Sequence, residues 1–376
     1  MSTFSPLTIG IDARAAAEVP AGRGRVVREL LRALSAHGED DHRYLLFARR
    51  AWEDQALLDE RFSWQLIEAR DPWWHVKAAR AVNRTCEVFL SSNSYLTSLF
   101  LRIPAVTIVY DLTTFEPSMR PNRRSTVIER LTLGPAVRRS TALLAISQTT
   151  ADALVRHFPA AAGRTVVAPL GVTPELAGGL GQGEAAALPP PGFVLAVGTL
   201  EPRKNLPRLV DAYSRLPAQL QDRHRLVVVG ALGWETGETL NALRSLGQRC
   251  TLLGYVSDAA LAELYRRCAV FCYPSLGEGF GLPVLEAMAA GAAVLTSNVS
   301  SLPEVGGDAV EYVDPKRVDD IAAELELLLR DEARRARLGE LARARASEFS
   351  WAHFTERVLH TLEDSATSTL RSRPRA

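Results

Sequence analysis

The feature that most constrains the fold is a repeated alternation of short apolar runs with amphipathic, helix-like segments. It occurs twice, once over residues 7–172 and again over residues 193–330. The apolar runs are nearly continuous instead of alternating with polar residues, which is the pattern of parallel strands covered on both faces. At 376 residues the chain is also long for one compact domain. We therefore expect an α/β protein with two doubly wound domains, each built on a parallel sheet.

A change in composition marks the boundary between the two repeats. Residues 178–192 are rich in Gly, Ala and Pro and show no apolar period, which is typical of a linker. The sequence thus predicts one Rossmann-like domain over 1–180 and a second over 190–350. The polar, basic end 367–376 is expected to be disordered.

The strand candidates matter because ligands bind beyond the carboxyl ends of strands in open parallel sheets. The loops that follow these strands are therefore the places to search for functional residues. The candidates are 7–14, 44–49, 87–93, 105–112, 141–147 and 164–172 in the first repeat, and 193–200, 224–233, 250–256, 269–275, 292–298 and 309–315 in the second.

Charge and composition exclude several function classes. The 44 basic and 43 acidic residues give a net charge of +1, which provides no overall field to attract nucleic acid. No apolar run approaches the roughly 18 residues of a membrane span, and the N-terminus lacks a secretory pattern. The four cysteines form no CxxC pair, so they are expected to be reduced. We expect a cytoplasmic protein, while the oligomeric state stays open.

Two adjacent cations follow the first strand of the second repeat. The loop TLEPRKN places Arg203 and Lys204 between that strand and a helix predicted from Leu206. Arginine supplies a bidentate fork and lysine a mobile point charge, and both suit phosphate. The alternative is a solvated turn with no ligand.

The stretch EGFGLPVLE carries two carboxylates, Glu278 and Glu286, around a glycine-bracketed turn. Pro283 fits the first turn of a helix, and glycines before it permit close approach of a ligand. A diphosphate could then contact the helix N-terminus and the two cations together. Because only Glu286 would lie on the helix, the carboxylates suit hydroxyls at different ends of an elongated ligand. The alternative is an ordinary loop that enters a helix.

Taken together, GTLEPRKN, LGYVSDAALAELYRRC and YPSLGEGFGLPVLEAMAAG resemble the retaining nucleotide-sugar glycosyltransferases of family 4. Two glutamates separated by seven residues are that family's signature. The resemblance is dense over about 190–350 and thinner over 1–180, and it extends to bacterial O-antigen and capsule mannosyltransferase-like enzymes. It implies the GT-B fold, with two Rossmann-like domains facing a cleft. It also implies an acceptor-binding first domain, a nucleotide-sugar-binding second domain and a helix, 351–366, that crosses back to the first.

The resemblance further implies roles for individual residues. Glu278 would hold hydroxyls of the donor sugar, and Glu286 would bind the ribose. Arg203 and Lys204 would bind the diphosphate and stabilise its departure as catalytic residues. The remaining donor-side residues implied are Gly279, Phe280, Gly281 and Leu282 beside the sugar, Tyr255 and Val256 at the base, Thr199 where many members have arginine, and Gly22 and Gly24 in the N-domain loop.

One departure from the family pattern concerns the acceptor side. Many members carry a His-Asp pair where this chain has Tyr110 and Asp111. A tyrosine is still able to donate a hydrogen bond there, and Asp111 stays a candidate catalytic residue near the acceptor. The alternative for Asp111 is a cap of the turn that follows it.

The sequence thus predicts a retaining hexosyltransferase of cell-surface polysaccharide synthesis, such as that of lipopolysaccharide O-antigen. The donor would be a nucleoside diphosphate sugar, with GDP-mannose or a related deoxyhexose donor first, and the acceptor a saccharide or a lipid-linked saccharide. No cofactor or metal is expected, because the cations already neutralise the diphosphate and no DxD motif is present. Peripheral contact with the inner membrane is expected as well. The alternatives are a catalytically silent binding subunit of an assembly complex, and a sugar-nucleotide epimerase or hydrolase.

Overall fold

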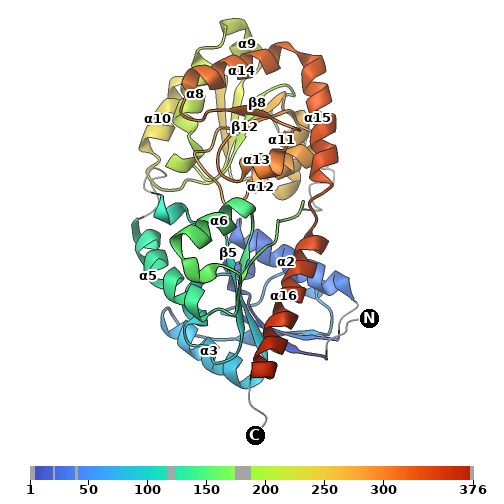
Figure 1. Cartoon of the computed structure of the whole chain (residues 1–376). Helices are drawn as coiled ribbons and strands as arrows, with labels where there is room; N and C mark the ends of the chain where they lie inside the picture. Colours follow the sequence, from blue (N-terminus) through green and yellow to red (C-terminus); the bar gives the residue numbers. More distant parts are fainter. Residues whose placement is uncertain (1–4, 20–21, 39–40, 117–122, 174–187, 373–376) are drawn as a thin grey trace. The chain divides into compact units, whose positions relative to one another are not determined.

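The computed structural model of the chain describes residues 5–19, 22–38, 41–116, 123–173 and 188–372. Figure 1 shows the chain coloured along its sequence. The chain divides into two compact units. Unit 1 comprises Met1–Phe115, Arg123–Gly171 and Ser350–Ala376, and unit 2 comprises Glu116–Asn122 and Val172–Phe349.

Unit 1 is built on a parallel sheet whose strands follow the order β3-β2-β1-β4-β5-β6-β7. β4 and β5 are buried along their whole length, as their uninterrupted apolar sequences predict. The strands are β1 (Thr8–Asp12), β2 (Arg43–Ala48), β3 (Phe62–Leu66), β4 (Val88–Ser91), β5 (Ala105–Val109), β6 (Ala142–Ala145) and β7 (Thr165–Val167). The helices are α1 (Arg14–Glu18), α2 (Arg23–His37), α3 (Trp73–Thr85), α4 (Tyr95–Ser98), α5 (Arg123–Arg139), α6 (Gln148–His157) and α16 (Trp351–Ser372).

The edge strand β3 was not among the predicted strands. Its sequence, FSWQL, contains no continuous apolar run, and its side chains are half-buried or exposed. An edge strand has only one neighbour and is less covered than a central one. The opposite edge strand, β7, was predicted because TVV is β-branched and largely apolar, so the pattern misses the edge whose sequence is mixed.

Unit 2 repeats the same design with the strand order β10-β9-β8-β11-β12-β13, again all parallel. Leu209 and Tyr213 of one helix pack with Leu325 and Leu328 of another in the core that covers the sheet. The strands are β8 (Val194–Val197), β9 (Leu226–Val229), β10 (Cys250–Gly254), β11 (Val270–Tyr273), β12 (Val294–Ser297) and β13 (Glu311–Val313). The helices are α8 (Leu206–Ser214), α9 (Ala218–Arg223), α10 (Gly237–Ser245), α11 (Asp258–Arg267), α12 (Leu282–Ala290), α13 (Leu302–Gly306), α14 (Val318–Arg330) and α15 (Glu332–Ala346).

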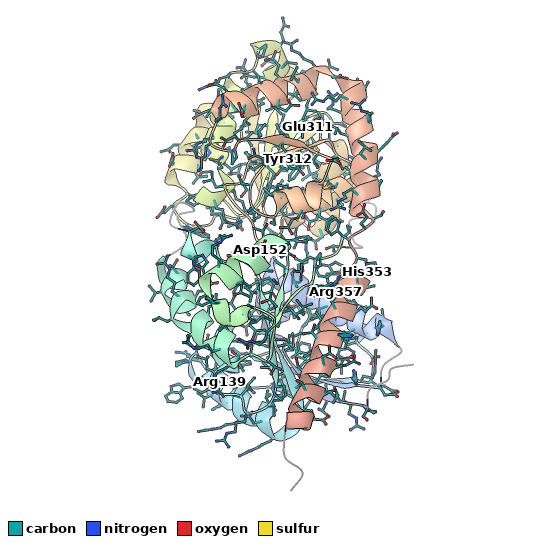
Figure 2. All side chains as sticks on the ribbon, viewed as in Figure 1. Arg139, Asp152, Glu311, Tyr312, His353 and Arg357 are labelled. Carbon is teal, nitrogen blue, oxygen red and sulfur yellow. The ribbon has the colours of Figure 1, made fainter. Side chains whose placement is uncertain are left out.

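The helix α16 follows unit 2 in sequence but belongs to unit 1, where it packs against α2, β4, β5 and β6 (Figure 1). Its buried face includes Phe354 and Leu362. Arg357 lies on this helix (Figure 2) and donates a hydrogen bond to the carbonyl of Val167 at 3.2 Å. The predicted end at 366 is wrong, because the helix continues to Ser372. Thr367 donates its hydroxyl to the carbonyl of Glu363 at 2.9 Å, so polar residues are accommodated inside the helix. Residues 373–376 lie outside the described part.

The ends of unit 2 are neighbours. The amide of Val172 donates to the carbonyl of Phe349 at 3.4 Å, which joins the first and last residues of its main segment. Most of the predicted linker, 178–192, lies outside the described residues. Across the described part of the chain, no helix is long and apolar enough to cross a membrane.

Candidate active site

The strand order of unit 2 identifies the edge where a ligand is expected. β8 pairs with β9 on one side and with β11 on the other. Strands β9 and β10 extend the sheet on one side of β8, and strands β11 to β13 extend it on the other side, so the strand order reverses at the gap between β8 and β11. In doubly wound sheets such a switch point opens a crevice at the carboxyl ends of the strands. The loops after β8 and β11 are those that carry the cationic pair and EGFGLP.

Asn205 ties these two loops together. It adopts a left-handed conformation with a φ of 60° at the start of α8, and its side chain is buried. Its Nδ2 donates to the carbonyl of Pro274 at 2.9 Å and to that of Pro315 at 2.7 Å. The short 3-10 turn Pro202–Lys204 is thereby held against the loop that follows β11.

Arg203, Lys204 and Glu278 form one ion-pair cluster. Arg203 Nη1 pairs with Glu278 Oε2, and Lys204 Nζ lies 2.8 Å from Glu278 Oε1. The side chains of Lys204 and Glu278 are only 11% and 8% exposed, so these charges are largely removed from solvent. The sequence predicted that all three residues contact a ligand, and the structure brings them together.

Neighbouring polar groups complete the cluster. Tyr273 and Ser275 donate their hydroxyls to Glu278 Oε1 at 2.8 and 2.7 Å. Glu201 Oε1 accepts from Arg203 Nη2 at 2.6 Å. Sequence reasoning missed these three residues, although each lies within five positions of a residue that it singled out. A buried charge requires several hydrogen-bond partners, and that requirement was the available signal.

The electrostatics follow from this packing. Burial alone would raise the pKa of Glu278, but the charges of Arg203 and Lys204 outweigh it and lower the pKa to about 2. Burial and the adjacent Arg203 lower the pKa of Lys204, and the charge of Glu278 opposes them. The pKa of the Tyr273 hydroxyl is raised by burial and by Glu278. Glu278 is therefore a carboxylate at every physiological pH.

Glu286 occupies a different environment from Glu278. It lies inside α12, is 3% exposed, and its Oε2 accepts a hydrogen bond from the Tyr265 hydroxyl at 3.1 Å. The helix begins at Leu282, after Gly281, whose φ of 108° is accessible to glycine at little cost. A Cβ at Gly281 would also lie 2.8 Å from Leu302 Cδ2. The two glutamates are thus separated by the start of the helix, as their spacing predicted.

The other predicted donor-side residues of unit 2 lie around this edge with different exposures. Phe280 is buried, and its ring packs edge-on against that of Phe349 at 5.9 Å. Tyr255, just after β10, is 65% exposed. Of the others, Thr199 is exposed, and Gly279, Leu282 and Val256 are half-buried.

The two glycines predicted to form an N-domain loop differ in location. Gly22 precedes α2 with a φ of 55° and is exposed. Gly24 lies inside α2 and is buried, and a Cβ there would lie 1.7 Å from the carbonyl oxygen of Val19. The prediction that Gly24 belongs to the loop is therefore wrong, because this position serves close packing of the helix against the preceding backbone.

Tyr110 and Asp111 follow β5 in unit 1. Tyr110 is 7% exposed and donates its hydroxyl to the carbonyl of Ser92 at 2.6 Å. The guanidinium of Arg23 lies 5.2 Å from the centre of the Tyr110 ring. Asp111 Oδ1 accepts from the amide of Thr113 at 2.9 Å, so the turn-capping alternative describes one of its contacts.

Among the described residues, no three His, Cys, Asp or Glu side chains are close enough together to hold an ion.

Comparisons with known proteins identify the family. The family "Glycosyl transferases group 1" matches residues 185–345, and "Glycosyltransferase Family 4" matches residues 20–176. The chain is 34% identical over 338 residues to O-antigen chain mannosyltransferase B of Escherichia coli. The aligned residues make up 87% of this chain and 83% of the relative. The chain is a family 4 glycosyltransferase.

Further similarities extend over one half or over the whole fold. This glycosyltransferase is 44% identical over 168 residues to the serotype-specific mannosyltransferase WbdA of Escherichia coli, covering 44% of this chain and 21% of WbdA. Among solved structures, sucrose-phosphate synthase from Thermosynechococcus elongatus superposes with a TM-score of 0.76 at 20% identity, covering 96% and 99% of the two chains. Anabaena Alr3699/HepE in complex with UDP and glucose gives 0.74 at 18%, covering 95% and 100%. The predicted family and GT-B fold are confirmed.

Proposed function

We propose that this glycosyltransferase moves a mannosyl group from GDP-mannose to a hydroxyl of a saccharide or lipid-linked acceptor in O-antigen synthesis, with retention of the anomeric configuration. The choice of sugar rests on the relatives, which are an O-antigen chain mannosyltransferase and a serotype-specific mannosyltransferase. The observation that carries the proposal is the buried Arg203–Lys204–Glu278 cluster at the switch point of unit 2. It provides two cations for a diphosphate and one carboxylate for sugar hydroxyls.

Donor binding would exchange the partners within this cluster. Without a ligand, Glu278 pairs with both cations, and Glu201 supplies a second negative charge to Arg203. An incoming diphosphate is the stronger anion and would take over the contacts of Arg203 and Lys204, because charge-assisted bonds to phosphate match both side chains. Glu278 would then accept from hydroxyls of the donor sugar, and Glu286 would bind the ribose.

The chemistry would be a same-face displacement. The acceptor oxygen bonds to the anomeric carbon while the bond from that carbon to the β-phosphate oxygen breaks. The acceptor proton passes to the departing phosphate oxygen. Arg203 and Lys204 would stabilise the charge that develops on the diphosphate, in a site where burial strengthens electrostatic interactions.

These two cations also lead us to propose that transfer needs no metal. EDTA should leave the rate unchanged. Loss of activity in EDTA and its return with Mg²⁺ or Mn²⁺ would contradict this part of the proposal.

We further propose peripheral contact with an anionic membrane through α5. This helix exposes Val127, Ile128 and Leu131, at 58%, 49% and 70%, and Arg130 is exposed beside them. Apolar side chains flanked by cations suit the surface of an anionic bilayer. Wild type should sediment with vesicles that contain phosphatidylglycerol and not with pure phosphatidylcholine. Leu131→Glu should weaken this binding, and equal binding of the variant would contradict it.

The deciding experiment supplies purified chain with GDP-, UDP-, dTDP- and ADP-sugars and a mannoside acceptor. Transfer from GDP-mannose with an α-linked product, assigned by NMR, is expected. An inverted product would overturn retention. Binding of a nucleotide sugar without turnover on any acceptor would favour the silent-subunit alternative. Epimerised or hydrolysed donor without transfer would favour the alternative enzymes.

A further inference from the structure

The switch point of unit 1 holds a set of polar side chains that the donor site does not use. Within this sheet β1 lies between β2 and β4, so the crevice is expected beyond the carboxyl ends of β1 and β4. Arg23 begins the helix α2, which follows β1, and Tyr95 begins α4, which follows β4. Asp111 follows β5, and Glu129 lies on α5, which packs against α4. Four groups from four loops or helices thus gather around one edge.

Two of these side chains each carry a buried polar atom that makes no hydrogen bond to the described residues. Tyr95 and Glu129 are each 9% exposed, and the Tyr95 hydroxyl and Glu129 Oε1 have no partner among the described residues. Buried polar atoms are nearly always paired, because an unpaired one loses its hydration without compensation. The adjacent Tyr110 follows that rule through its bond to Ser92. The hydroxyl of Thr114, which is also buried and unpartnered, lies beside Glu129 and helps to stabilise its charged form. The unpaired atoms thus form a buried polar group that is able to accept one further hydrogen-bonding ligand.

The charges around these atoms indicate what kind of group fits. Burial and the charge of Asp111 raise the pKa of Glu129, Arg23 and the hydroxyl of Thr114 oppose them, and the resulting pKa is about 7. Burial would lower the pKa of Arg23, but Tyr95, Asp111 and Glu129 together hold it above its ordinary value. Near neutral pH the cluster thus balances one guanidinium against one or two carboxylates.

This balance favours a neutral ligand that is rich in hydroxyls. A phosphate would face the carboxyl groups of Asp111 and Glu129, and among the described residues Arg23 is the cation whose charge acts on Glu129. A sugar hydroxyl both donates and accepts, so it is able to pair with the Tyr95 hydroxyl and with Glu129 Oε1 together. Arg23 and Asp111 are half-buried and would contact the same sugar from the more exposed side.

We propose that Tyr95 and Glu129 bind a hydroxyl of the acceptor saccharide at the switch point of unit 1, and that they determine which acceptor is used. The inference rests on the proposed transfer for the chemistry of the acceptor. It assigns a function to two side chains that belong to none of the motifs by which the family is recognised.

The first test separates acceptor from donor kinetics. Glu129→Ala and Tyr95→Phe should each raise the acceptor KM about 10-fold or more and leave the donor KM unchanged, because a site that pairs a hydroxyl loses discrimination when its partner is removed. The matched control is Glu29→Ala, which removes another buried carboxylate of unit 1 that is bound to Arg32 at 2.6 Å. The control should change stability and leave the acceptor KM unchanged. Unchanged acceptor KM in both test variants would overturn the inference, as would an equal rise in the control.

The second test uses the conservative variant, which keeps the size of the side chain. Glu129→Gln should abolish the change in acceptor KM that the wild type shows between about pH 6 and 8. The charged and titratable groups that face Glu129 are Asp111, Arg23 and Tyr95, the hydroxyl of Thr114 lies beside it as well, and all four residues are retained in this variant. A pH dependence that survives in Glu129→Gln would assign the titration to another group and contradict the inference.

The third test does not depend on transfer. Titration of the full chain with methyl α-mannoside and with mannobiose should show saturable binding that Glu129→Ala weakens about 10-fold. If no donor is turned over but this difference is found, the proposed transfer fails and the binding site stands. If wild type transfers mannose and the variants bind both probes as wild type does, the proposed transfer stands and this inference fails.

Discussion

The two sheets share one design and differ in how completely the polar groups at their switch points are paired. In unit 2, the Glu278 carboxylate accepts hydrogen bonds from Arg203, Lys204, Tyr273 and Ser275. In unit 1, Glu129 Oε1 has no partner among the described residues. The same topology thus supports a site whose opposite charges pair without a ligand and one that leaves an oxygen of a buried carboxyl without a partner among the described residues. The first is expected to exchange partners when a ligand binds, and the second to gain one.

The largest effect is expected from breaking the paired site. Glu278→Ala should reduce kcat about 10³-fold, because it removes the proposed contact with the donor sugar and leaves Lys204 without its carboxylate partner and Arg203 with Glu201 alone. Steady-state kinetics with saturating donor measure this effect. Glu263→Ala, which removes a carboxylate paired with Arg266 and Arg267 on α11 of the same unit, is the matched control and should retain activity. A kcat for Glu278→Ala within a few-fold of wild type would mean that the cluster is only structural.

A smaller effect is expected at the second glutamate of the motif. Glu286→Ala should raise the donor KM about 10-fold with little change in kcat, because a ribose contact is the same in the ground state and in the transition state. Tyr265→Phe removes only the hydroxyl that donates to Glu286, so it separates the two roles of this carboxylate. Equal effects of the two variants would indicate that Glu286 supports the fold of α12 and not the donor.

The last effect concerns stability: the contributions of Glu278 and Glu129 to the free energy of unfolding should depend on pH in opposite directions. The pKa of Glu278 is lowered from 4.5 to about 2, so its stabilising contribution is present above pH 4.5 and is lost as the pH falls towards 2. The pKa of Glu129 is raised from 4.5 to about 7, so the sign is reversed, and stability is lost as the pH rises through 7. Urea unfolding at pH 5 and pH 8 measures this difference. The free energy of unfolding of Glu129→Gln relative to wild type should be higher at pH 8 than at pH 5, by on the order of 1–3 kcal/mol. No gain at pH 8 would contradict the raised pKa.

The sequence predicted the architecture because its signals are local. Continuous apolar runs identify buried parallel strands wherever they occur, and EGFGLPVLE places Glu278 on a loop and Glu286 on a helix by spacing alone. β3 was missed because its sequence, FSWQL, mixes apolar and polar residues and its side chains are half-buried or exposed. The end of α16 was predicted too early because the polar residues beyond Ala366 resemble a tail, although they continue the helix.

The contacts at the two switch points could not be predicted in the same way. That Arg203, Lys204 and Glu278 pair with one another depends on the order of strands in the sheet, which no local pattern encodes. Arg23, Tyr95 and Glu129 lie on three helices far apart in sequence. Their shared position emerges only when the strands between them are assembled.

The hydrogen bond between Val172 and Phe349 has a consequence for how such enzymes diversify. The chain enters unit 2 and leaves it at neighbouring points, so the segment between them is a cassette with two adjacent ends. Recombination at these two junctions would exchange the whole segment while leaving the rest of the chain, including its final helix, intact. With donor binding in unit 2 as proposed, such an exchange would change the donor specificity in one genetic step, without rebuilding the unit that is proposed to recognise the acceptor.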